Sequence, residues 1–165
     1  RGGLVEQHDP RPHAHRAGDR DALLLTAGDL PRVLVRLFGD VDARELLHAA
    51  AADRLSRQRQ PLWSVPSVLA EAAHFMPGWL RPQLARAASA GLVQVSVPDA
   101  AGYGRIAWLL EKYSALSPDW ADCELIWLAE ASGVHRIATL DAKDFGVYRI
   151  LGRKAFDIVW PPAVV

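Results

Sequence analysis

The chain has 165 residues, of which 50% are hydrophobic and 8% aromatic, so it can bury a core of its own as one domain. Its 19 basic and 19 acidic residues give a formal net charge of +0, which excludes a basic field over the whole molecule. Cys123 is the single cysteine, so the chain can form no internal disulfide and fits a reducing compartment. No apolar run reaches the roughly 18 residues of a membrane span and no secretory segment opens the chain. We therefore expect a cytoplasmic protein that does not enter a membrane.

Residues 1–30 differ in composition from the rest of the chain. They are polar, rich in Gly, Pro and His, and show neither helical nor strand periodicity. The composition predicts a poorly ordered tail, with one domain over residues 31–165. At the start of that domain, the β-branched run 32–38 predicts a strand and the apolar spacing of 42–58 predicts a helix.

Strand and helix patterns then alternate along the chain. Pro66 opens a helical pattern, Asp99 is a suitable N-cap, and Gly133 is a suitable helix stop. Ser117 and Pro118 fit the N-cap and first position of the helix that Gly133 ends. The pattern predicts strands at 61–65, 91–97, 135–140 and 156–160, and helices at 66–76, 80–90, 99–115 and 119–132. The G-x-G at 102–104 lies inside a helical pattern and predicts no phosphate loop.

Strands separated by helices require crossover connections and therefore favour a parallel sheet. We predict an α/β fold, a three-layer α/β/α sandwich around a central, mostly parallel sheet. In such sheets, functional side chains gather at the carboxyl ends of strands and at the adjacent helix starts.

Acidic residues fall at these places. Asp141 directly follows a predicted strand, Asp119 and Asp122 lie in the first turns of a helix, and Glu71 lies on the helix after the second strand. Carboxylates that are brought together repel one another, and a hard divalent cation relieves that repulsion. Such an ion can activate water for displacement at phosphorus, which predicts phosphodiester hydrolysis. Ordinary capping by Asp119 and a plain turn at 141–145 are the alternative interpretation.

Three segments resemble a known family: "SVLAEAAHF", "SPDWADCELIWLAEASGV" and "IATLDAKDF". In this order they are similar to the later motifs of the PIN-domain ribonucleases, in particular the VapC-like toxins of type II toxin-antitoxin pairs. The resemblance covers roughly residues 60–160. It implies a PIN-like sandwich, an endoribonuclease site that uses Mg²⁺ or Mn²⁺, an RNA substrate and an antitoxin partner. Family members commonly form homodimers, and helix 80–90 offers one apolar surface for that.

The resemblance also assigns the site. It implies catalytic and metal-binding roles for Glu71, Asp122 and Asp141, further metal-binding roles for Asp119 and Asp144, and a polar position beside the site for Thr139.

The first strand departs from the family pattern. PIN domains begin with a strand that delivers an aspartate, but in the run 32–38 that position holds Arg36. Asp40 and Asp42 follow closely and Asp21 is a more distant option, so the first acidic ligand stays unassigned. Because an arginine side chain does not lose its charge, it would compete with a cation for the carboxylates. Two functions therefore remain open, an active endoribonuclease and a catalytically impaired PIN-like binding module.

Overall fold

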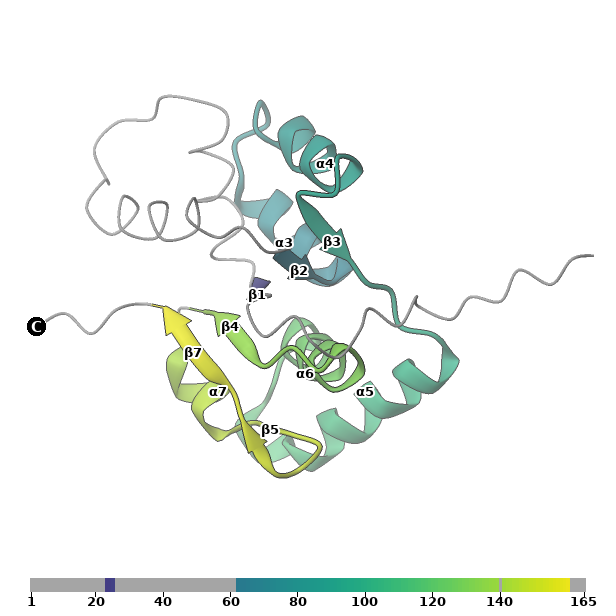
Figure 1. The fold of residues 1–165 in the computed structure, drawn as a ribbon, viewed down its shortest axis with the longest axis vertical. Coiled ribbons are helices and arrows are strands. Elements are labelled where there is room, and N and C mark those ends of the chain that lie inside the picture. Colours follow the sequence, from purple (N-terminus) through teal and green to yellow (C-terminus); the bar gives the residue numbers. More distant parts are fainter. Residues whose placement is uncertain (1–22, 26–61, 140, 161–165) are drawn as a thin grey trace, which may run out of the picture.

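The computed structural model describes residues 23–25, 62–139 and 141–160, and a five-stranded sheet organises them (Figure 1). The strand order is β3-β2-β1-β4-β7, and every neighbouring pair is parallel. The strands are β1 (Leu23–Leu25), β2 (Leu62–Ser64), β3 (Val93–Val95), β4 (Arg136–Ala138) and β7 (Asp157–Trp160). A small antiparallel hairpin of β5 (Arg149–Ile150) and β6 (Lys154–Ala155) lies outside the sheet. The predicted α/β class with a parallel sheet is therefore confirmed, while the three-layer arrangement stays a prediction.

The central strand β1 corrects the sequence analysis. Leu23–Leu25 lie in the stretch predicted to be a poorly ordered tail, yet they pair with β2 on one side and β4 on the other. Leu24 is fully buried. A strand that is buried on both faces does not need alternating polar residues, and three leucines in a polar segment give almost no periodic signal. The rest of the predicted tail, the predicted strand 32–38 and the predicted helix 42–58 lie outside the described residues.

The helices agree well with the prediction from residue 66 to residue 132. They are α3 (Pro66–Phe75), α4 (Arg81–Ser89), α5 (Ala100–Lys112) and α6 (Trp120–Ser132), with a 3-10 turn η1 (Ser114–Leu116) before α6. Asp99 caps α5 as expected, because its side chain accepts a hydrogen bond from the backbone N–H of Gly102 at 2.7 Å. Gly133 ends α6 with φ 76°, a left-handed conformation that glycine adopts without strain. The longest of these helices have 13 residues, and none in the described part of the chain could cross a membrane.

Helix α6 is the central helix of the core. Its residues Ala121, Cys123, Glu124, Leu125, Ile126, Leu128 and Ala129 are buried, so almost its whole circumference is covered. Helix α5 packs against it closely at Gly102, where an added Cβ would stand 2.8 Å from Nε1 of Trp127. This close packing of α5 on α6 explains why the first position of the G-x-G pattern holds a glycine. In Figure 1, α5 and α6 lie together on one side of β4, whereas α3 and α4 lie beside β2 and β3.

The topology gathers several helix starts at one edge of the sheet. Because all five strands are parallel, their carboxyl ends share an edge, and α3 begins directly after β2. A short helix, α7 (Ala142–Val147), begins just after β4, in the segment for which a plain turn was the alternative interpretation. Helix α6 ends just before β4 starts, so it runs back along the sheet and its first turn lies towards the same edge. This edge is where function was predicted.

Candidate functional site

Asp119 and Asp122 stand at the start of α6. Asp119 is the N-cap, and its Oδ1 accepts a hydrogen bond from the backbone N–H of Asp122 at 2.7 Å. The prediction that Ser117 caps this helix, with Pro118 as its first residue, is wrong. Ser117 instead ends the preceding 3-10 turn in a left-handed conformation with φ 50°. A carboxylate at a helix N-terminus pairs with free backbone N–H groups and with the positive end of the helix dipole.

Asp141 and Asp144 repeat this arrangement at the start of α7. Asp141 is the N-cap, and its Oδ1 accepts a hydrogen bond from the backbone N–H of Asp144 at 3.1 Å. The backbone N–H of Asp141 donates to Oγ1 of Thr139 at 3.0 Å, and Thr139 is only 1% exposed. A buried hydroxyl at the end of β4 therefore fixes where α7 starts. The same sequence pattern, Asp-x-x-Asp, builds both turns.

The two turns act on each other electrostatically. Burial and, next in size, the negative charge of Asp119 raise the pKa of the Asp122 carboxyl from its usual 3.8 to about 7. The charges of Asp141 and Asp144 also raise this pKa, whereas a hydrogen bond from Tyr148 opposes the rise. The structure thus brings Asp119, Asp141 and Asp144 within electrostatic range of Asp122, whose ionised form burial and these charges disfavour.

Tyr148 connects α7 to Asp122 and was missed from the sequence. Its hydroxyl donates to Oδ2 of Asp122 at 3.1 Å, and its side chain is fully buried. Burial and the neighbouring Asp122 charge raise the pKa of Tyr148, which keeps the hydroxyl protonated as a donor. The ring packs edge-on against Tyr113 and Phe145, with centroid distances of 5.0 and 5.3 Å. The sequence gives no local signal for this contact, because it depends on how α7 docks on α6.

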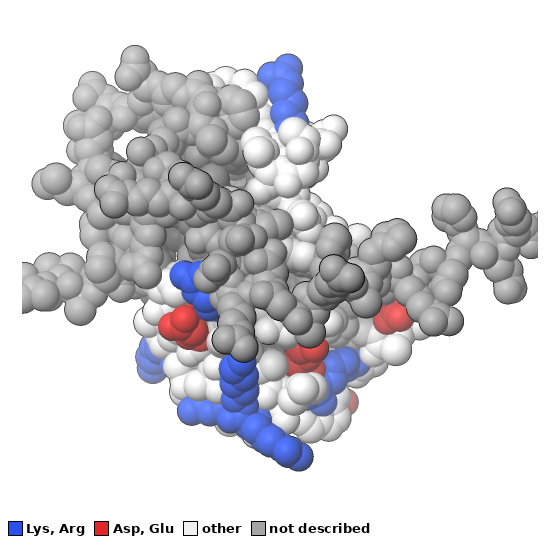
Figure 2. Space-filling view, viewed as in Figure 1, with Lys and Arg blue, Asp and Glu red and all other residues white. Residues whose placement is uncertain are grey.

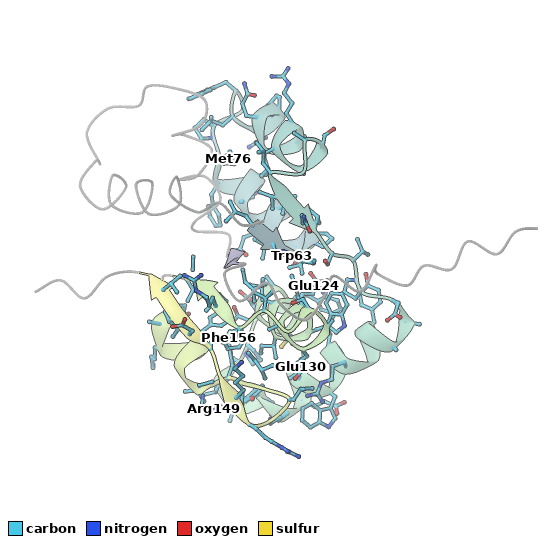
Figure 3. All side chains as sticks on the ribbon, viewed as in Figure 1. Trp63, Met76, Glu124, Glu130, Arg149 and Phe156 are labelled. Atoms are coloured by element: carbon cyan, nitrogen blue, oxygen red, sulfur yellow. The ribbon has the colours of Figure 1, made fainter. Side chains whose placement is uncertain are left out.

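Two glutamates, Glu71 on α3 and Glu124 on α6, differ in their surroundings. Glu71 lies exposed on α3, and its charge is not among those of the described residues that shift the pKa of Asp122. Glu124 is only 4% exposed, and its Oε2 accepts a hydrogen bond from the hydroxyl of Ser67 on α3. Figure 3 shows Glu124 on the side of α6 that faces β2. A glutamate between apolar residues of a predicted core helix was the available signal for this buried contact, and the sequence analysis did not use it.

Solved structures show what the fold resembles. VapC20 of Mycobacterium tuberculosis, described as a sarcin-ricin loop cleaving toxin, superposes with a TM-score of 0.59 at 12% identity, covering 73% of this chain and 91% of VapC20. This chain has a VapC-like PIN fold. No protein-family model and no curated protein sequence matches the chain. At this identity the similarity concerns the fold alone.

The first acidic ligand of the PIN fold is absent from the described residues. The first strand of the described sheet is β1 (Leu23–Leu25), so Arg36 does not stand at its end, and the sequence continues from Leu25 to Thr26, which has no carboxylate. Arg36, Asp40, Asp42 and Asp21 all lie outside the described residues. Within the described ranges, no three His, Cys, Asp or Glu side chains are already placed to hold one metal ion. The metal-binding roles of the predicted residues therefore stay predictions.

Basic side chains lie on the same face as acidic ones. Figure 2 shows Lys and Arg side chains over the lower part of the molecule, with smaller acidic areas between them. The guanidinium of Arg105 pairs with Glu130, Nε to Oε2 at 2.7 Å, and stacks 4.0 Å from the ring centre of Trp108. Arg149 donates to three backbone carbonyls around the end of α7. These two cations therefore already have structural partners.

Proposed function

We propose that this chain is a metal-dependent endoribonuclease of the VapC toxin type, which hydrolyses RNA phosphodiester bonds. The observation that supports the proposal is the convergence of two Asp-x-x-Asp turns around Asp122, whose pKa burial and the neighbouring aspartates raise to about 7. Capping alone would require only Asp119 and Asp141. The cleavage of RNA by VapC20, which shares the fold, supports the same reaction class.

Mg²⁺ or Mn²⁺ is the cofactor that the acid cluster would hold. Carboxylate oxygens are the ligands these hard cations prefer, and a cation would remove the repulsion that disfavours ionised Asp122. Asp122 and Asp141 would bind it with Glu71, and Asp119 and Asp144 would contribute from the two caps. Asp119 and Asp141 use Oδ1 as helix caps, which leaves their second oxygens available to a cation, and Glu71 on α3 is exposed. When bound, the cation would activate a water molecule and offset negative charge at the scissile phosphate.

The protein's own groups prepare the site for that ion. Thr139 holds the backbone of Asp141 from within the core, so the carboxylate is presented from a fixed point. Near neutral pH, with no cation bound, the raised pKa of Asp122 keeps part of the molecules protonated at this carboxyl. Cation binding must release that proton. Metal affinity should therefore rise with pH across neutrality.

Four further parts of the proposal follow from the toxin type. The substrate is a structured RNA, the regulatory partner is a cognate antitoxin, the chain forms a homodimer, and it acts in the cytoplasm. Each agrees with the resemblance and with the VapC-like fold.

Metal titration and RNA cleavage, measured on the same samples, test the proposal. We would measure Mg²⁺ and Mn²⁺ binding by calorimetry, and cleavage of a sarcin-ricin loop RNA and an unrelated hairpin. Asp122→Ala should abolish metal binding and cleavage together. Asp157→Ala is the matched control, because Asp157 pairs in register with Arg136 at the amino ends of β7 and β4, the opposite edge of the sheet. It should retain both activities; their loss in both variants, or in neither, would contradict the proposal.

A catalytically impaired binding module is the second candidate function. The sequence Leu25-Thr26 favours it, because the strand at the centre of the sheet is not followed by an aspartate. If the parent chain binds neither cation in the titration, the module is the correct interpretation and the nuclease is not.

A further inference from the structure

The contact between Tyr148 and Asp122 joins the two halves of the acid cluster. The backbone N–H of Tyr148 caps the end of α7 by donating to the carbonyl of Asp144 at 3.1 Å. Its side-chain hydroxyl donates to Oδ2 of Asp122 on α6 at 3.1 Å. One residue thus fixes the helix that carries one Asp-x-x-Asp turn and also contacts the other turn. Among the described residues, the Tyr148–Asp122 contact is the hydrogen bond by which a side chain of the α7 segment contacts an aspartate of α6.

We propose that Tyr148 is a positioning residue, which holds the aspartate pair of α6 against the pair of α7 and reserves Oδ1 of Asp122 for the cation. The inference rests on the proposed metal-dependent function and adds to it a residue that acts through Asp122 without touching metal or RNA. A carboxylate has two oxygens, and a hydrogen bond to one of them limits how the side chain can rotate. The free oxygen is then presented in one orientation.

The surroundings of Tyr148 make it suitable for this role. Its ring is fully buried and packs edge-on against Phe145, which in turn packs edge-on against Phe156 at 5.3 Å between centroids. It also contacts Tyr113 of the segment after α5. A buried side chain packed against two other rings has few alternative rotamers, so its hydroxyl is held in one position. Groups that orient metal ligands in this manner typically change metal affinity or activity about 10- to 100-fold when removed.

Tyr113 provides a matched control for the experiment. It belongs to the same aromatic cluster and is nearly buried, but its hydroxyl accepts a hydrogen bond from the backbone N–H of Arg149 at 3.0 Å and does not contact an aspartate. Tyr148→Phe and Tyr113→Phe therefore each remove one buried hydroxyl and keep the ring. A general effect on folding would appear in both variants, whereas an effect on metal positioning would appear only in Tyr148→Phe.

The test measures Mn²⁺ affinity by calorimetry, the melting temperature in EDTA, and the cleavage rate as a function of Mg²⁺ concentration. Tyr148→Phe should weaken Mn²⁺ binding about 10-fold or more, shift the Mg²⁺ midpoint of cleavage upward by a similar factor, and leave the KM for RNA unchanged. Tyr113→Phe should retain the parent's affinity and midpoint, at a comparable melting temperature. If the parent binds Mn²⁺ and both Phe variants bind it equally well, Tyr148 has no positioning role and the nuclease proposal stands. If the parent binds no cation, the nuclease proposal fails first, and the role of Tyr148 fails with it.

Discussion

Replacing Asp122 with Asn should stabilise the metal-free protein at alkaline pH. Asn has nearly the same shape, and its amide oxygen can still accept the Tyr148 hydrogen bond, so the substitution mainly removes a charge. The folded-state pKa of Asp122 is raised to about 7 from 3.8, because the ionised form is buried beside three other aspartates. Below pH 3.8 the group is protonated in both states. Between about pH 4 and pH 7 the unfolded chain has lost the proton and the folded chain has not, so the folded state loses stability as pH rises.

The size of this effect follows from the shift. A rise from 3.8 to about 7, at 1.36 kcal/mol for each pKa unit, sets an upper limit of about 4 kcal/mol once pH exceeds the folded-state pKa. The side chain is partly exposed, and solvent screening reduces the effect to about 2 kcal/mol. For a chain of this length that corresponds to a difference of about 4 to 8 °C in melting temperature.

Urea and thermal melts in EDTA, from pH 4 to pH 8.5, measure the effect as the difference between Asp122→Asn and the parent. The difference should be small near pH 4, grow through neutrality, and reach about 2 kcal/mol in favour of the variant above pH 7. Asp157→Asn, at the opposite edge of the sheet, controls for the loss of one negative charge. A difference that does not change with pH, or a parent that stays the more stable protein above pH 7, would refute the electrostatic reasoning.

Two substitutions away from the acid cluster test the packing that supports it. Gly102→Ala should destabilise the fold by about 1 to 3 kcal/mol, because the new Cβ overlaps the indole of Trp127, whereas Gly104→Ala in the same helix meets no atom within 4 Å and should cost nothing or stabilise slightly. Urea denaturation of the two variants compares them directly. Ser67→Ala should cost about 1 to 3 kcal/mol in the same assay, because it removes a hydrogen bond to the buried carboxylate of Glu124. Adding Glu124→Leu to Ser67→Ala should recover most of that loss, and a double variant as unstable as the sum of both changes would contradict this explanation.

Much of the fold was predictable because its signals are local. The starts and ends of α3, α5 and α6 lie within three residues of the prediction, since Pro66, Asp99 and Gly133 act on their own helix termini. The strand β1 was not predictable in this manner. Its identity as a strand comes from pairing with β2 and β4, which are distant in the sequence, and three leucines alone do not indicate that pairing.

The same distinction applies to the site. Residue type and position relative to strand and helix ends were sufficient to find Asp119, Asp122, Asp141 and Asp144. They were not sufficient to find Tyr148 or the Ser67–Glu124 contact, because each joins two elements whose mutual arrangement appears only in the folded chain. The sequence also did not show that Glu71 would lie exposed and separate from the charges that act on Asp122.

Capping and metal binding were set against each other as interpretations of the aspartates, and the geometry makes them compatible. Asp119 and Asp141 do cap α6 and α7, and each uses one oxygen, Oδ1, to accept a backbone N–H. Capping therefore fixes where these two carboxylates stand and leaves their second oxygens available. Asp122 distinguishes the interpretations, because it caps nothing, is largely buried, and is held where three neighbouring negative charges oppose its ionisation. A protein that needed only two helix caps would gain stability by replacing Asp122. Two properties of Asp122→Asn therefore decide what the cluster is for: its stability in EDTA, and the absence of any change in that stability when Mg²⁺ is added.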